Sequence, residues 1–118
     1  MALKLNDRAY RHAQKLIEDG KVERDEGEAW SGHRPSVKEQ NEFIDAHGFG
    51  GYGRWYLGVD DDYDENAKAH FKFPYGDFQL AHRCGVLAAG SWAAKRDHPD
   101  IQAAAAHLLA MIDARPGA

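Results

Sequence analysis

The chain has 118 residues and a formal net charge of −4, with 43% hydrophobic and 29% charged residues. A chain of this length forms one domain with a core of its own, and the composition is typical of a globular protein rather than a disordered one. The acidic balance argues against broad binding to a phosphate backbone, so we expect no nucleic-acid partner. The sequence therefore predicts a single compact domain over residues 1–118.

The cysteine content and the hydropathy of the chain indicate in which cellular compartment the protein resides. Cys84 is the one cysteine, which excludes an intramolecular disulfide and fits a reducing cytosol. No apolar stretch approaches the roughly 20 residues that a membrane helix needs. The start of the chain lacks the apolar segment of a secretory signal. We therefore expect a soluble cytoplasmic protein without membrane contacts.

The first predicted helix is capped by Asn6 or Asp7 and ends at Gly20. Its apolar stripe comprises Ala9, Ala13, Leu16 and Ile17. Residues 21–35 are predicted to be a long loop, either functional or loosely ordered, with Trp30 as its large apolar group.

The second predicted helix begins with a capping box, in which Ser36 and Glu39 satisfy each other's backbone N–H groups. Gly48 is predicted to end this helix. Residues 48–53 match the pattern G-x-G-x-x-G, but a helix precedes them and the strand-like segment 54–59 follows. A dinucleotide site needs the opposite order, so we interpret the glycines as a helix end that continues into an irregular turn.

Residues 60–65 are rich in carboxylates, which suggests a calcium loop. An EF-hand counted from its first residue requires Gly and Glu at positions that hold Glu65 and Phe71 here. A solvated turn fits better, with Asp64 capping a short helix that ends near His70. Weak, nonspecific cation binding remains the alternative.

An extended segment and a third long helix are predicted next. Residues 71–75 read as an edge strand, because Pro74 cannot donate to a sheet and restricts Phe73 to an extended conformation. Gly76 then allows a turn. Asp77 is predicted to cap a helix from Phe78 to about Lys95.

Two adjacent rows of side chains follow this third helix. The rows are Leu80, Cys84 and Leu87, and Ala81, Gly85, Ala88 and Trp92. Gly85 in a row of small residues predicts close packing of another backbone, and Cys84 is expected in the core. His82 and Arg83 are predicted to project on the wetter side of the helix. The helix dipole disfavours cations at that end, unless an acid or a bound anion compensates.

The last helix is predicted to begin at residues 97–99 and to end near Arg115. Its buried stripe comprises Ile101, Ala105, Leu108 and Ile112. The expected fold class is α+β and predominantly helical. Three longer helices and a short helix are expected to pack around a two-stranded β element formed by residues 54–59 and 71–75.

From about Gly20 onward the chain resembles a family of small bacterial proteins to which no activity is assigned. The matching residues are His33-Arg34-Pro35-Ser36, Phe43-Ile44, Gly48-Phe49, Trp55-Tyr56-Leu57-Gly58, Lys68, Phe71 through Phe78, His82-Arg83-Cys84-Gly85, Asp100-Ile101 and Ala104-Ala105. The chain departs from the pattern at Tyr56 and Trp92, where the family commonly has His and Arg, which removes two polar groups. The resemblance implies bacterial origin and a compact domain, and it implies no activity.

The candidate site residues are Lys68, Asp77, His82 and Arg83, which could hold a small ligand or an anion. No nucleophile motif or second carboxylate accompanies them, so we predict no catalytic residues and a structural role for Asp77. We also predict no cofactor and no metal site, because no two histidines have ligand spacing. A metal site assembled from His47, His70 and His82 remains open.

Two function classes remain open. The first is a non-enzymatic interaction or regulatory module that associates with itself or docks an unknown protein partner over Trp30 and Trp55. The alternative is a small-ligand or anion-binding protein, an enzyme among its forms, that uses Lys68 and the residues near Asp77. The first requires an exposed apolar patch or an oligomer interface, and the second requires its side chains to converge on one concave surface.

Overall fold

The strand β3 (Tyr56–Asp60) lies at the centre of a three-stranded antiparallel sheet, between β1 (Leu3–Leu5) and β4 (Phe71–Pro74). All of its residues are buried, as a strand covered on both faces requires. The computed structural model describes residues 3–24 and 30–114, with the backbone alone for residues 31 and 33.

The predicted pairing of the two extended segments is confirmed. Tyr56 lies opposite Pro74 and Gly58 lies opposite Lys72 in the antiparallel ladder. Pro74 stands on an edge strand, where its missing N–H costs no ladder hydrogen bond. The third strand, β1, was not predicted, because a segment of only three residues carries no readable periodicity.

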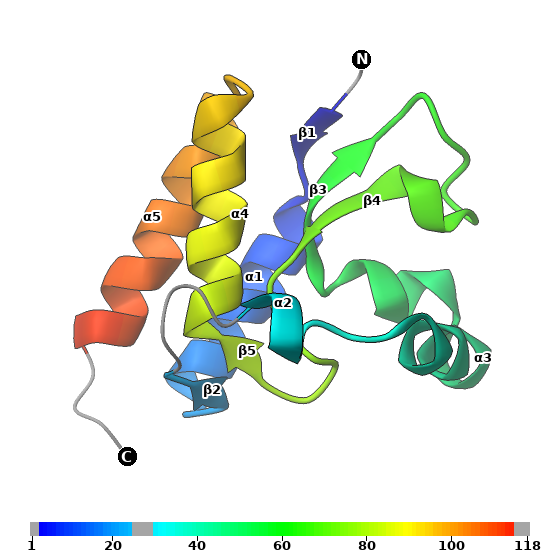
Figure 1. Ribbon diagram of the computed structural model, residues 1–118, viewed down its shortest axis with the longest axis horizontal. Coiled ribbons are helices and arrows are strands. Elements are labelled where there is room, and N and C mark those ends of the chain that lie inside the picture. Colours follow the sequence, from blue (N-terminus) through cyan, green and yellow to red (C-terminus); the bar gives the residue numbers. More distant parts are fainter. Residues whose placement is uncertain (1–2, 25–29, 115–118) are drawn as a thin grey trace.

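Helices cover the sheet and form most of the fold, which is α+β and predominantly helical as predicted. Figure 1 shows α4 (Arg83–Lys95) and α5 (Pro99–Ala114) side by side on one flank, with α3 (Val37–Gly53) on the other. Between them α1 (Asp7–Glu18) lies against β3 and α5. In the described part of the chain, no helix combines the length and the apolar character needed to cross a bilayer.

The core lies where these helices meet the sheet. Its largest fully buried side chains are Tyr52, Tyr75, Ile17, Leu57, Ile101, Leu108, Ile112, Val86 and Cys84. The predicted stripes of the first and last helices are therefore confirmed, as is the burial of Cys84. The Cα radius of gyration is 13.2 Å, close to the value of about 13 Å expected for a compact domain of this size.

The glycine-rich segment of α3 is partly helical, which corrects the predicted irregular turn. The capping box at Ser36 and Glu39 is present, with hydrogen bonds of 3.0 and 3.1 Å. Gly48 breaks the helix as predicted, at φ 72° and ψ 176°. Beyond this kink, the chain resumes helical geometry through Gly53. Gly53 lies so close to the Phe71 ring that a Cβ at position 53 would stand 2.4 Å from Phe71 Cε1.

The third long helix begins later than predicted. It begins at Arg83, with His82 at its N-cap, and the segment before it forms a turn and the short strand β5 (Ala81–His82). Phe78 adopts φ 71°, a left-handed conformation that cannot begin a helix. β5 pairs in parallel with β2 (Val22–Glu23), so tertiary pairing prevails over local helix propensity.

Three other predictions are corrected. Asp64 caps no helix: its carboxylate accepts the Asn66 N–H at 2.8 Å, and only the 3-10 turn η1 (Lys68–His70) follows. The predicted loop 21–35 contains β2 and the helical turn α2 (Trp30–His33), while residues 25–29 lie outside the described residues. Phe73 has φ 63° rather than the extended value expected before a proline.

Candidate functional site

The four residues predicted to form one cluster are divided among separate contacts. Asp77 and His82 are paired, with 2.9 Å between Asp77 Oδ2 and His82 Nε2. Arg83 instead binds Asp113 on α5. Lys68 lies in η1, where it lines a surface hollow with residues of α3 and β4.

The Asp77–His82 pair is held in a turn by further hydrogen bonds from the backbone. Asp77 Oδ1 accepts hydrogen bonds from the backbone N–H groups of Gln79 and Leu80, at 3.0 and 2.8 Å. Burial alone would raise the Asp77 pKa, but the His82 hydrogen bond and the two backbone N–H groups outweigh it and lower that pKa below its ordinary value. His82 is only 6% exposed. The predicted wetter-side position of His82 is therefore wrong.

Arg83 makes a bidentate pair with Asp113, with distances of 2.8 and 3.1 Å that join α4 to α5. The hydrogen bond from Arg83 lowers the Asp113 pKa. The sequence predicted that an acid or an anion offsets the charge of the two side chains at this helix start. Asp77 lies beside His82 and Asp113 lies beside Arg83, so acids do this.

The two tryptophans predicted as an interaction surface are both buried. Trp55 is 5% exposed, and its ring stacks on that of Tyr75 at a centroid distance of 5.9 Å. Trp30 is 9% exposed and its ring lies 5.6 Å from the His82 ring. The large apolar side chains that are exposed among the described residues are instead Val37, Tyr63 and Trp92.

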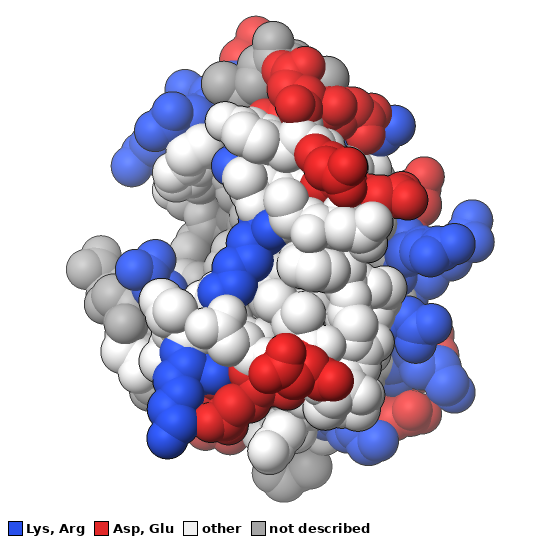
Figure 2. Space-filling model, turned by 90° about the vertical axis from the view of Figure 1, so that its right-hand side faces the viewer, with Lys and Arg blue, Asp and Glu red and all other residues white. Residues whose placement is uncertain are grey.

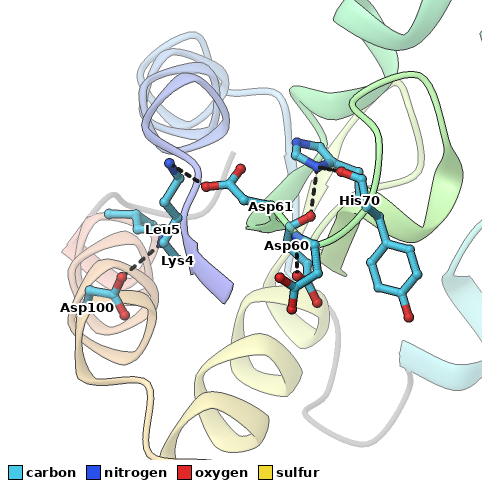
Figure 3. A network of polar contacts seen from close by, with 8 residues as sticks. Lys4, Leu5, Asp60, Asp61, His70 and Asp100 are labelled. Atoms are coloured by element: carbon cyan, nitrogen blue, oxygen red, sulfur yellow. Dashed lines mark hydrogen bonds and ion pairs between the residues drawn. The ribbon is translucent and has the colours of Figure 1, made fainter. Parts of the chain in front are cut away.

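Carboxylates at the end of β3 and directly after it contact other groups of the protein (Figure 3). Asp61 pairs with Lys4 at 2.8 Å, and Asp60 Oδ1 accepts the Asp62 N–H at 3.0 Å. His70 Nδ1 lies 2.8 Å from the Asp60 carbonyl oxygen, so this nitrogen carries the proton that it donates. Within the described ranges, no three His, Cys, Asp or Glu side chains are grouped as a metal ion would require.

The surface hollow that Lys68 lines is the strongest candidate site. We call it the cationic hollow; it has a volume of about 640 Å³ and includes Arg34, Lys68 and Lys72. The rest of its lining is Pro35, Ser36, Val37, Gln40, Tyr52, Tyr56, Ala69, Phe71 and Pro74. Among the residues that the structure describes, three cations therefore face a lining without an acidic residue.

These three cations have no acidic partner within the described part of the chain, where no carboxylate lies within ion-pairing distance of them. Lys68 and Lys72 are half-buried and Arg34 is exposed. Lys72 Nζ stands 5.1 Å from the centroid of the Tyr63 ring, a cation–π contact that leaves its charge uncompensated. The hollow is thus a concentration of positive charge on a protein whose net charge is negative.

A chain of hydrogen bonds fixes one wall of the cationic hollow. Tyr56 donates to the Tyr52 hydroxyl at 2.7 Å, Tyr52 donates to Gln40 Oε1 at 3.2 Å, and the Gln40 amide donates to the Pro35 carbonyl at 3.2 Å. Burial raises the pKa of both tyrosines, so their hydroxyls stay protonated and neutral. The wall is rigid and carries no negative charge.

The N-terminus of α3 borders the same hollow through Ser36 and Val37. The first N–H groups of a helix have no partner within the helix, and the dipole adds partial positive charge there. The capping box uses the Glu39 N–H and orients the first turn of the helix toward the hollow's rim. This end of the helix adds to the field of the three cations.

A second hollow, of about 480 Å³, lies beside the start of α1 but has mixed charge. Its lining combines Lys4, Arg8 and Arg54 with acidic residues that include Asp7 and Asp61. Lys4 is already paired with Asp61. Among its described residues, the lining of this hollow therefore holds as many carboxylates as Lys and Arg side chains, which makes it the weaker candidate.

Sequence reasoning found Lys68 but missed Arg34 and Lys72 as members of the site. Lys72 stood in the extended segment and Arg34 stood in the predicted loop, so no spacing signal related them. Comparison of the chain with protein-family models, with curated proteins and with solved structures finds no match.

Proposed function

We propose that this protein is a binding module that captures an anionic group, a phosphate or a carboxylate, in the cationic hollow. The observation that carries the proposal is that Arg34, Lys68 and Lys72 line one hollow whose described residues include no acid. This is the anion-binding alternative raised by the sequence, with Asp77, His82 and Arg83 replaced by residues from other segments.

The three side chains that carry the proposal have the same positive charge. Cations that line one hollow without a counterion repel one another, the more strongly the closer their charges lie. A bound anion removes this repulsion and gains charge-assisted hydrogen bonds from the same groups. Arg34 suits a planar carboxylate or a phosphate, because its guanidinium presents parallel N–H donors.

The lining favours binding over catalysis. Its described residues include no His, Cys, Asp or Glu that could act as a general base or nucleophile. Ser36 Oγ accepts the Glu39 N–H, and the tyrosine hydroxyls are protonated and hydrogen-bonded to one another. The buried His82 ring and the half-buried Asp77 carboxylate are paired with each other, which supports the structural role expected for Asp77.

The competing hypothesis of partner docking over Trp30 and Trp55 has less support. Both rings are buried and are therefore not available as a docking surface. The same cationic hollow could still recognise the anionic group when it belongs to a larger molecule, and the proposal concerns that group.

The test is calorimetric titration of the whole protein with pyrophosphate and, in parallel, with acetate. We expect Lys68→Gln and Lys72→Gln each to weaken pyrophosphate binding by about tenfold, because a hydrogen bond to a charged group contributes roughly 1.5 kcal/mol. The acetate titration separates carboxylate capture from phosphate capture.

Lys15→Gln is the matched control, since Lys15 is an exposed lysine on α1 whose side chain pairs with Asp19 at 3.8 Å. It removes the same charge elsewhere on the surface and should leave the affinity unchanged. Absence of binding to both anions would contradict the proposal, as would equal losses in the control and the hollow variants.

A further inference from the structure

An aromatic groove adjoins the cationic hollow. The groove has a volume of about 230 Å³, and its ring walls are Trp30, Phe73 and Trp92. Arg34, Lys72 and Pro74 line both the groove and the hollow, so the two adjoin along these residues. The rest of the groove is Ala88 and Ala89 on α4. Apolar walls therefore lead directly to the unpaired cations.

Trp92 is the accessible wall of this groove. It is 40% exposed, which is unusual for the largest apolar side chain. The Phe73 ring meets it edge-on at 4.6 Å, and the Arg96 guanidinium stands 3.8 Å from its ring centroid. These contacts hold the indole in place, so the groove exists before any ligand arrives.

Phe73 forms the floor of the groove in a strained conformation. Its φ of 63° is a genuine outlier for a bulky residue, although the side chain is only 8% exposed. Gly58 makes this position possible, because a Cβ at Gly58 would stand 2.7 Å from Phe73 Cδ2. Strain of this kind persists where the surrounding structure enforces it, and it is common at ligand-binding sites.

We infer that the hollow and the groove together bind one small ligand, an aromatic anion. Its flat ring lies in the groove against Trp30, Phe73 and Trp92, and its phosphate or carboxylate lies among Arg34, Lys68 and Lys72. This inference rests on the proposed function and adds the chemical class of the ligand. A volume of about 230 Å³ has room for one ring system, and the aromatic walls favour a flat ring through stacking and edge contacts.

Charge limits the ligand to a small molecule. The face that carries α3 and the β3–β4 hairpin shows Lys and Arg side chains at mid-height, with acidic side chains gathered above and below them (Figure 2). A polyanion that extended beyond the hollow would meet these acids and a net charge of −4. A single anionic group avoids that repulsion.

The experiment compares phenyl phosphate with inorganic phosphate, and benzoate with acetate, by calorimetric titration of the whole protein. We expect the aromatic member of the favoured pair to bind at least about tenfold more tightly, because the ring removes apolar surface from water. The two pairs identify whether the anionic group is a phosphate or a carboxylate.

Trp92→Ala should remove most of this aromatic advantage while leaving the affinity for inorganic phosphate or acetate unchanged, and Trp92→Phe should restore part of it. Thermal unfolding of both variants checks that the fold is intact. If simple anions bind but the ring adds nothing, the inference is wrong and the proposed function stands. If neither aromatic nor simple anions bind, both are wrong.

Discussion

At the scale of single residues, Asp77 is a candidate site residue whose carboxylate instead accepts hydrogen bonds from the backbone. It accepts hydrogen bonds from Gln79, Leu80 and the His82 ring, and together these lower its pKa although its partial burial opposes that change. The sequence predicted that Asp77 caps a helix, which is wrong, although its carboxylate does accept backbone N–H groups. The structure places Asp77 in the turn that precedes β5.

The Asp77 contacts predict an acid-dependent contribution to stability. Because its pKa is lower in the folded state, the contribution is fully present above the unfolded value of about 3.9 and is lost as pH falls through the folded pKa. We expect Asp77→Asn to lower the free energy of unfolding by about 1 kcal/mol near neutral pH, and by less in acid.

Urea denaturation of wild type and Asp77→Asn across this acid range measures the effect. Asp45→Asn is the control, since Asp45 is exposed on α3 and should change stability little at any pH. A deficit for Asp77→Asn that stays constant down to the lowest pH would show that the ionised carboxylate is not the stabilising group.

At the scale of elements, α4 depends on a close approach of backbone to backbone. A Cβ at Gly85 would stand 2.7 Å from the Tyr75 carbonyl oxygen, so only glycine allows the helix to lie against this segment. The sequence predicted this packing from a row of small residues. It could not predict the late start of the helix, because the pairing of β5 with β2 is a long-range contact.

Two glycine substitutions separate packing from helix propensity. Gly85→Ala should destabilise the protein by about 1–3 kcal/mol, because overlap with the Tyr75 backbone exceeds the gain of about 1 kcal/mol that alanine brings to a helix. Gly50→Ala is the control: it lies in the second helical part of α3, with open space around its Cβ position, and should be neutral or stabilising.

Chemical denaturation of the two glycine variants decides between these expectations. If Gly85→Ala were as stable as the wild type, α4 would have to shift away from Tyr75 at little cost. The close contact would then not limit the position of this helix.

At the scale of the whole molecule, the candidate site depends on the fold. Arg34 precedes α3, while Lys68 and Lys72 flank the start of β4. The sheet and the kinked α3 bring these segments together around the Tyr52–Tyr56 pair. The sequence predicted the fold class and the pairing of β3 with β4, because periodicity and turn residues are local signals. Convergence of charges from distant segments leaves no such signal.

The central claim is that the cationic hollow captures an anion, and a residue-resolved titration tests it most directly. Amide chemical shifts of the isotope-labelled protein would be followed by nuclear magnetic resonance as pyrophosphate is added. We predict that the largest saturable shifts occur in residues 34–40 and 67–74, around Arg34, Lys68 and Lys72. Absence of saturable shifts there, or larger shifts around the α1 hollow at Lys4, Arg8 and Arg54, would contradict the account.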